Sequence, residues 1–521
     1  MRKGLFISGV VLLSSINFSS AQITFQKTYG GTGYETFLFG FQASDSSYIF
    51  GGWATSVDDG YLVKTASDGT TTWSKSYDIY APDGFSCGVT TPGNGYILAG
   101  FSSFYPEALV MKNDSSGNAV WSKSYVEGYD FNAVAIEQAI DGGYALVANT
   151  DSDGFANSAA FLFKIDSSGN SLWCRSYSGN GNVAFNTVKP TADNGYITAG
   201  WSDIPGSGGR DILLVKTDSI GNLLWSKSYG GTDYDVGYGI YQASDQGYII
   251  AGTTSSFGNL PGDAYIIKTD SSGNILWNKI YDIPNVAVVI TSLGSTTDGG
   301  FVFTGITDTS GAPVDHNAFM AKIDSAGNLL WSYSYGGGQD DFSFFVQQTY
   351  DAGYIIAGGT KSFGAGSMDG FVVKTDSNGI DNCNASALPF IVNIPATQVA
   401  NTTIIQLPFN LPEYNNTSTI NSFGSATTIC TGTGIETTAP YEHSLITISP
   451  NPCTNKFLIR FSHLINKGVI EIYDVIEKKI YTENISNASQ KEIRLNNMYA
   501  GMYFVKVMDG ERSYCRKLIV E

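Results

Sequence analysis

Histidine is nearly absent from this 521-residue sequence, and its scarcity argues against several kinds of site. Only His316, His443 and His463 occur, so a metal centre built on histidines is not expected. A hydrolytic triad needs a histidine base, and His316 lies in a polar loop where we expect a solvated side chain and no catalytic role. The glycine spacing of a phosphate-binding loop is missing as well, so no bound cofactor is expected.

Positive charge is also scarce through most of the chain. Between Gln22 and Pro440 there are 16 Lys and Arg against 38 Asp and Glu, a net charge of −22, whereas the whole chain carries −18. A surface this acidic repels nucleic acid and favours solubility outside the cell or Ca²⁺ binding. After residue 21 no apolar run reaches the roughly 20 residues of a membrane helix, so no transmembrane segment is expected.

The N-terminus has the pattern of an export signal. Met1-Arg2-Lys3 is basic, Leu5 to Leu13 is apolar, and Ser19-Ser20-Ala21 supplies small residues that favour cleavage before Gln22. Residues 1–21 are therefore predicted to be a signal peptide. No cysteine stands at the cleavage site, so a lipid anchor is not indicated, and the mature protein is expected to reach an oxidising compartment.

Six cysteines then become candidates for disulfides. We expect two pairings among the fifteen connectivities that six cysteines allow: Cys383 with Cys430, and Cys453 with Cys515. The other two, Cys87 and Cys174, fall in different repeats and are expected to be buried small apolar residues.

One motif recurs through the first 380 residues. It first occurs as Trp73-Ser-Lys-Ser-Tyr77, and its tryptophan returns at intervals of 48 to 54 residues: Trp121, Trp173, Trp225, Trp277 and Trp331. Phe25 to Tyr29 is a degenerate copy that precedes them all. Six of the eight tryptophans thus occupy one structural position, which indicates packing and not a cofactor platform.

Each repeat of about 50 residues contains four short apolar runs divided by Gly, Asp, Asn and Ser, which is typical of a four-stranded propeller blade. Ala264–Asp270 and Ile275–Tyr281 form a hairpin in this pattern, and the tryptophan run is expected to be the outermost strand. The seventh repeat lacks a tryptophan run after Gly379, and the spare run Ile23–Tyr29 completes it. The sequence therefore predicts an all-β fold, with a seven-bladed β-propeller at residues 22–380.

The hairpin that carries the tryptophan is similar to two known propeller motifs. Ser67 to Trp73 resembles the Asp-box of sialidase-type propellers, and Lys216 to Trp225 resembles the tryptophan-docking motif of quinoprotein propellers. Both motifs are packing features, so the resemblance implies a fold and no chemistry. Across Gln22–Asn378 the chain looks like the Gly/Tyr-rich repeat propellers of secreted bacterial proteins.

Four motifs occur in order over the last eighty residues. They contain Pro450, Asn451 and Pro452, then Tyr473 and Asp474, then Gly501 and Tyr503, and finally Lys517. This series resembles the type A sorting domain of the type IX secretion system of Bacteroidota. The resemblance implies a small β-sandwich at residues 441–521 that carries the protein across the outer membrane, with the secretion machinery as partner, and is removed on release or anchoring. Glu477-Lys478 replaces the family's Gly-Lys, so the local turn is expected to differ.

Between these regions, residues 381–440 contain no Lys or Arg and are rich in Thr, Asn and Pro. This composition suggests a linker, and two alternatives stay open. The segment carries strands at Ile391–Ile394 and Thr403–Leu407 and is held by Cys383 and Cys430, or it is fully disordered.

One lysine recurs at an equivalent position in all seven repeats: Lys64, Lys112, Lys164, Lys216, Lys268, Lys322 and Lys374. Six of them have an aspartate two residues later, which places both side chains on one face of a strand. Its presence in every repeat indicates a structural ladder, since a site on the ring axis rarely needs every copy.

The two faces of the predicted ring differ in how much they vary. The Asp-Ser-Ser-Gly-Asn turns and the turns before the Gly-Tyr-Ile-Ile runs are nearly uniform, whereas the opposite connections differ between repeats. Since variable loops carry function more often than uniform turns, we place a candidate binding site on the variable face. Its residues are Trp53, Trp201, Glu35, Asp130, Asp235, Asp340 and Asp341. Carboxylates beside aromatic rings suit sugar stacking or Ca²⁺, and they equally suit the capping of glycine-rich turns.

These features predict a secreted or cell-surface binding protein that recognises a glycan, a peptide or another surface protein. The alternative is an extracellular polysaccharide-active hydrolase or lyase that uses carboxylates of the propeller face. No carboxylate pair stands apart from the repeat pattern, which disfavours the enzyme.

Overall fold

The computed structural model describes residues 22–521, apart from 56, 80–82, 103–106, 127–130, 151–156, 205–208, 259–261, 310–314, 410, 417, 432–445, 450–455, 475–478, 495–500, 510–511 and 521. The predicted signal peptide lies outside the described residues. The chain divides into two compact units, Met1–Gly434 and Ile435–Glu521, and each is described by itself.

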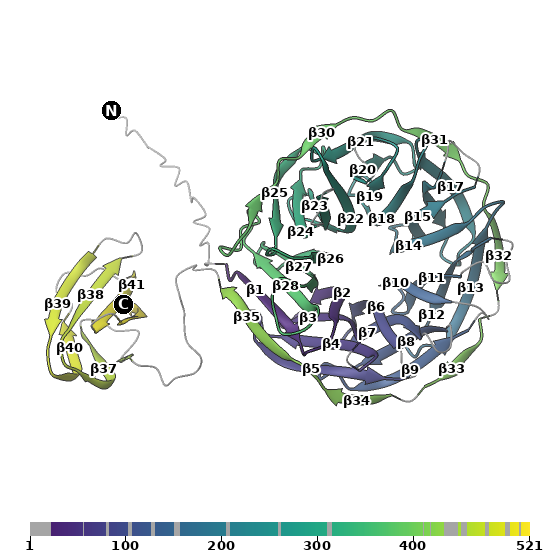
Figure 1. Ribbon diagram of the computed structural model, residues 1–521. Helices are drawn as coiled ribbons and strands as arrows, with labels where there is room; N and C mark the ends of the chain where they lie inside the picture. The colour runs from purple at the N-terminus through teal and green to yellow at the C-terminus, as the bar shows by residue number, and fades with distance from the viewer. Residues whose placement is uncertain are drawn as a thin grey trace, which may run out of the picture. The chain divides into compact units, whose positions relative to one another are not determined.

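Seven antiparallel sheets form the ring of a seven-bladed β-propeller, which confirms the predicted fold class (Figure 1). Every blade begins with an inner strand close to the ring axis. These inner strands are β2 (Glu35–Gln42), β6 (Asp83–Thr90), β10 (Asn132–Gln138), β14 (Val183–Pro190), β18 (Asp235–Gln242), β22 (Val286–Ser295) and β26 (Asp341–Gln348).

The second and third strands of the blades are almost entirely buried. The second strands are β3 (Tyr48–Ala54), β7 (Tyr96–Ser102), β11 (Tyr144–Asn149), β15 (Tyr196–Ser202), β19 (Tyr248–Thr254), β23 (Phe301–Thr309) and β27 (Tyr354–Thr360). The third strands are β4 (Asp59–Thr65), β8 (Glu107–Asn113), β12 (Ala160–Ile165), β16 (Asp211–Thr217), β20 (Asp263–Thr269), β24 (His316–Ile323) and β28 (Asp369–Thr375). Their continuous apolar runs reflect burial on both faces between neighbouring blades.

The fourth strand carries the tryptophan motif. In blades one to six it is β5 (Thr71–Asp78), β9 (Ala119–Tyr125), β13 (Ser171–Ser178), β17 (Leu223–Gly230), β21 (Ile275–Asp282) and β25 (Leu329–Tyr335). In the seventh blade the fourth strand is β1 (Phe25–Gly30), which pairs with β28. The N-terminal strand therefore closes the ring.

The expectation that the tryptophan strand lies outermost is wrong, because a fifth strand covers it in every blade. These strands come from residues 386–431, which we call the belt: β29 (Ser386–Ala387), β30 (Ile391–Asn393), β31 (Gln398–Asn401), β32 (Ile405–Phe409), β33 (Glu413–Asn415), β34 (Thr419–Ser422) and β35 (Ser425–Thr431). Each pairs with a different fourth strand, in the order of blades six, five, four, three, two, one and seven. The segment suggested as a linker thus runs once around the ring (Figure 1).

A disulfide joins Cys383 to Cys430, with their Cα atoms 6.0 Å apart, which confirms that predicted pairing. Because the belt has travelled around all seven blades between these cysteines, the bond closes a hoop around the propeller. Cys453 lies outside the described residues, so its pairing with Cys515 stays a prediction. Cys174 is buried and Cys87 is partly buried, and neither is in a disulfide.

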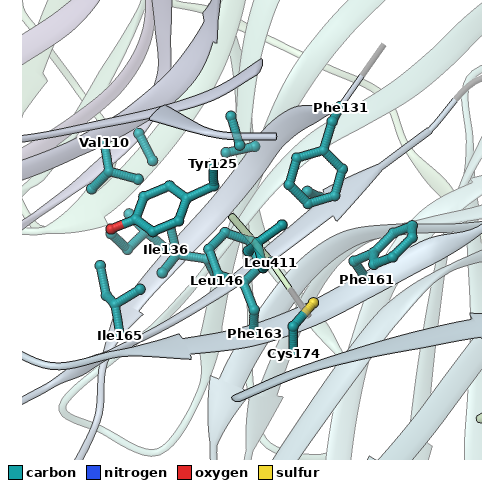
Figure 2. Packing of buried hydrophobic residues seen from close by; sticks show 14 of the residues in the cluster. Val110, Tyr125, Phe131, Ile136, Leu146, Phe161, Phe163, Ile165, Cys174 and Leu411 are labelled. Atoms are coloured by element: carbon teal, nitrogen blue, oxygen red, sulfur yellow. The ribbon is translucent and has the colours of Figure 1, made fainter. Parts of the chain in front are cut away.

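Belt side chains also enter the apolar layers between blades. Figure 2 shows the layer between the second and third blades, where Leu411 of the belt packs among residues such as Tyr125, Phe161 and Cys174. Ile404 is likewise buried in the next layer. Such burial holds a segment whose strands are too short to be stable alone.

The tryptophan motif fastens each blade to the next. Its tyrosine hydroxyl donates to the carbonyl of a turn glycine in the following blade at 2.6–2.7 Å in all seven copies, as Tyr77 does to Gly117. Its tryptophan covers the same glycine, where an added Cβ would lie 2.7 Å from Trp73. That glycine also has a positive φ, 75° at Gly117, so no other residue fits both demands.

The repeated lysines are structural, but their partner is not the aspartate two residues later. Lys216 pairs with Asp193 at 2.9 Å, in the turn between the first two strands of its blade, and the same pair occurs in six blades. Lys112, whose turn has no aspartate, donates instead to the Ser167 carbonyl. The aspartate two residues later caps its own turn, as Asp270 accepts from the amides of Ser272 and Asn274.

The C-terminal unit is a small sandwich of two sheets. One contains β36 (Ile446–Ser449), β37 (Lys456–Ile465) and β40 (Ala488–Arg494), and the other contains β39 (Lys479–Ile485), β38 (Gly468–Asp474), β41 (Gly501–Asp509) and β42 (Arg512–Val520). A shared core that includes Ile459, Ile472 and Val505 packs between them. The Glu477-Lys478 turn lies outside the described residues.

Candidate functional site

The predicted carboxylates of the variable face are mostly buried beneath it. This face carries the loops between second and third strands and the links between blades; the uniform face carries the turns between first and second and between third and fourth strands. Glu35, Asp235 and Asp341 begin inner strands and are 0% exposed. Asp235 accepts from the Gly231 amide at 2.9 Å, and Asp341 accepts from the Gly337 amide at 2.7 Å. These side chains are in the turn-capping arrangement.

Some of these carboxyl groups have shifted pKa values because they are withdrawn from water. Burial raises the pKa of Asp235 and that of Asp341. Burial, and then the neighbouring Asp83 carboxylate, raises the pKa of Asp59 to about 6. Asp83 in turn accepts from the amides of Gly60 and Ile79, so its carboxylate holds two backbone segments together. A raised pKa can mark a catalytic acid, but here the groups are committed to the links between blades.

Asp340 is the predicted carboxylate that gathers charged partners. It accepts from His316 Nδ1 at 2.8 Å and from Lys361 Nζ at 2.7 Å. The hydrogen bond from Lys361, and then that from His316, lowers its pKa to about 2. The other histidine nitrogen lies 3.8 Å from an Asp308 oxygen and so faces a carboxylate, not a nucleophile. Asp130 lies outside the described residues.

The two candidate tryptophans are both partly buried and stand in blades one and four, so the structure does not bring them together. The Trp53 ring lies 6.2 Å from that of Tyr34, and its Nε1 is buried without a hydrogen-bond partner. The Arg210 guanidinium lies 3.8 Å from the Trp201 ring centroid and covers one face of it. Neither ring is a bare platform.

A cavity of about 170 Å³ lies on the ring axis and is lined by inner-strand residues of all seven blades. It contains an ion pair between Glu137 and Lys189 of neighbouring blades, and the Lys189 ammonium lies 4.6 Å from the Tyr241 ring centroid. Tyr241 and Val346 also line a second pocket of about 370 Å³. The remaining lining of that pocket comes from inner-strand ends and turns of the uniform face. The pocket therefore opens on the face opposite to the one where the sequence predicted a binding site.

A comparison of equivalent residues between repeats could have signalled this pocket. The equivalent residues at the penultimate inner-strand position are Phe41, Val89, Glu137, Lys189, Tyr241, Gly294 and Gln347. Only the sixth repeat has glycine there, and the pocket lies beside it.

Among the described residues, no group of three or more His, Cys, Asp and Glu side chains is placed to hold a metal ion. Within the same residues, no helix has the length and apolar character needed to cross a membrane.

Three of the sorting motifs meet in one sheet of the C-terminal unit. Tyr473 of β38 pairs with Phe504 of β41, and Phe504 pairs with Lys517 of β42. Asp474 pairs with Tyr503, which is buried in the core, and Gly501 begins β41. Pro450, Asn451 and Pro452 lie outside the described residues.

Residues 447–521 match a family model described as a secretion system C-terminal sorting domain, which confirms the resemblance drawn from the motifs. This domain marks the chain for export by the type IX system and for secretion or attachment at the cell surface. No curated protein matches the sequence.

Solved structures give weaker likenesses. Sqt1 from Chaetomium thermophilum is 11% identical over 67% of this chain and 98% of its own, with a TM-score of 0.40. The extracellular domain of a hybrid two-component system from B. thetaiotaomicron is 9% identical over 94% of this chain and 98% of its own, with a TM-score of 0.19.

Proposed function

We propose that the protein is an exported binding module whose propeller captures a ligand outside the cell. Residues 1–21 act as the signal peptide for the first membrane, and the sorting domain directs the second step. The propeller remains after sorting and does the binding.

The observation that carries this proposal is how the ring uses its polar groups. Carboxylates of the variable face cap the links between blades, and lysines pair with turn aspartates, so these groups serve the scaffold. The second pocket, which we call the uniform-face pocket, in contrast includes Gly294, Ser295 and Tyr350, which differ from the residues at the same positions of the other repeats. A pocket of about 370 Å³ is within the range of about 300–1,000 Å³ typical of ligand sites.

The alternative, a polysaccharide-active hydrolase or lyase, has less support. Such an enzyme needs two carboxyl groups facing one cleft. Among the described residues that line the axial cavity and the second pocket, Glu137 is the one carboxylate, and it is paired with Lys189.

The test is a binding screen with the mature chain, beginning at Gln22, against an array of glycans and peptides and against culture-supernatant proteins. The proposal expects saturable capture of at least one class without its chemical conversion. Turnover of a captured polysaccharide would favour the enzyme, and absence of any capture would reject the binding module.

A further inference from the structure

The uniform-face pocket is the place where the ring departs from its own sevenfold pattern. Gly294 of blade six lines this pocket, and its φ is not positive, so close packing and not backbone conformation favours glycine there. An added Cβ would lie 3.1 Å from a Val302 methyl carbon and 3.3 Å from the Val346 carbonyl. The next residue, Ser295, is exposed and small, where four sister repeats have Gln42, Gln138, Gln242 and Gln348. The short side chain of Ser295, in place of a glutamine, therefore widens the pocket.

Two tyrosines line this space, and because the Lys189 ammonium lies 4.6 Å from the Tyr241 ring centroid, Tyr350 is the ring that we assign to stacking. Tyr241 lies on the wall shared with the axial cavity, and Tyr350 lies at the rim, 67% exposed. Tyr350 occupies a turn position that reads Ser44, Pro92, Ile140, Ala192, Ser244 and Thr297 in the other repeats. The Tyr350 amide donates to Gln42 Oε1 at 2.8 Å, which fixes the backbone that carries the ring.

The polar groups of the pocket are neutral and held in place. Gln347 Oε1 accepts from the Gln42 amide at 2.9 Å, and Gln348 Oε1 accepts from the Thr297 amide at 2.7 Å. Each amide is thereby oriented. Gln348 Nε2 also donates to the Ala352 carbonyl at 3.5 Å, and the second hydrogen of this nitrogen remains for a ligand. Ser295 adds an exposed hydroxyl.

The charges around the pocket are already paired. Lys189 pairs with Glu137 on the axis, and the nearby turns hold the pairs Lys322–Asp298 and Lys374–Asp351. A charged ligand would find no opposite charge to compensate its desolvation. Aromatic faces beside oriented amides and hydroxyls suit a flat, hydroxyl-rich and uncharged molecule.

We propose that this pocket binds a neutral saccharide, one or two rings of a glycan stacked on tyrosine, with the amides of Gln347 and Gln348 as donors to its hydroxyls. The proposal rests on the binding function above and names its site and ligand class. It moves that site from the variable face to the uniform face.

The test uses the full mature chain and a panel of glucose, galactose, mannose, N-acetylglucosamine, cellobiose and maltose, with glucuronic acid and a mixed peptide pool as comparison probes. Titration calorimetry and saturation-transfer NMR measure binding. Tyr350→Ala removes the rim ring, and Ile140→Ala is its matched control, since Ile140 is 70% exposed at the same turn position of blade three. Ser295→Gln restores the residue of the sister repeats and narrows the pocket.

A neutral saccharide is expected to bind, and Tyr350→Ala is expected to weaken it by roughly tenfold, with no change from Ile140→Ala. Ser295→Gln is expected to weaken saccharide binding more than Tyr350→Ala does, while the melting temperature of the protein stays the same. If a saccharide binds but is indifferent to Tyr350→Ala and Ser295→Gln, this site is wrong and the binding module stands. Binding of only glucuronic acid or the peptides would overturn the ligand class. If nothing binds in this panel and nothing is captured in the screen above, both proposals are overturned.

Discussion

The repeated blades and the belt both contribute strands to the same seven sheets, but their sequences are of opposite kinds. The first four strands of every blade come from a unit repeated seven times, with tyrosine, lysine and glycine at fixed places and tryptophan in six of the copies. The belt has no repeat, no Lys or Arg, and strands of two to seven residues, yet it adds one strand to each blade.

The difference shows what each kind of sequence specifies. The ring has seven similar outer edges, each formed by the fourth strand of a blade. An extended segment that passes such an edge can form backbone hydrogen bonds with it, whatever its side chains. The belt therefore needs only extended residues, a few apolar anchors such as Leu411, and a closure, which Cys383–Cys430 provides. The regular spacing of the belt strands therefore follows from the repeated blades and not from the belt sequence.

The largest effect is expected at the strand where the two regions meet. β1 lies between β28 and β35, so it is both the last strand of the ring and the support for the end of the belt. A chain that begins at Gly30 is expected to aggregate or to melt far below a chain that begins at Gln22, because two strand edges become exposed. Equal melting temperatures of the two chains would show that the ring closes in another way.

Opening the hoop should have the next largest effect. The double substitution Cys383→Ser and Cys430→Ser frees a loop with a sequence separation of 47 and is expected to lower the free energy of unfolding by about 2–4 kcal/mol. Denaturant unfolding measures the change, and Cys87→Ala, outside the belt, is the control. An unchanged midpoint would mean that pairing alone fixes the belt.

A smaller loss is expected from removing one anchor of the belt. Leu411 is buried between the second and third blades, so Leu411→Ala should cost about 2–3 kcal/mol, whereas Leu407→Ala, at a belt residue that is 54% exposed, should cost almost nothing. Equal costs for the two substitutions would contradict the placement of the belt.

The smallest loss is expected from removing one hydroxyl of the tryptophan motif, because a single hydrogen bond contributes little net free energy of unfolding. Tyr281→Phe removes one hydroxyl bonded to the Gly327 carbonyl at 2.7 Å and is expected to cost about 1 kcal/mol. Tyr350→Phe, at an exposed ring, is the control. A cost of several kcal/mol would show that the Tyr281 hydroxyl stabilises the ring by more than this one hydrogen bond.

The repeat made the ring predictable but did not predict the course of the belt. Of the two alternatives for that segment, strands near Ile391–Ile394 and Thr403–Leu407 held by Cys383–Cys430 agree with β30, β32 and the disulfide. The spacing of Trp73 and its copies fixes the number of blades, and the missing seventh tryptophan run indicates the use of β1. Residues 386–431 have no such spacing, and the partner of each short strand is an edge far away in the sequence. Two signals were present: the cysteines that bracket the segment, and isolated apolar residues such as Ile404.

The candidate site was predicted less well. The contrast between the two faces predicted a binding site among the variable loops. Asp235 and Asp341 instead cap turns, which was the alternative role that the sequence left open. The pocket depends on a short side chain at Ser295, where four other repeats have glutamine, and on the curvature that brings Tyr241 and Tyr350 to one space. Neither is visible in a search for chemical groups.

Amide hydrogen exchange of the mature chain tests most directly whether the belt is part of the propeller. The account predicts that peptides from residues 386–431 exchange slowly, because their backbone groups pair with the fourth strands of all seven blades, and that exchange accelerates when Cys383–Cys430 is reduced. Fast exchange throughout these residues in the oxidised protein, as expected for an unpaired linker, would contradict it.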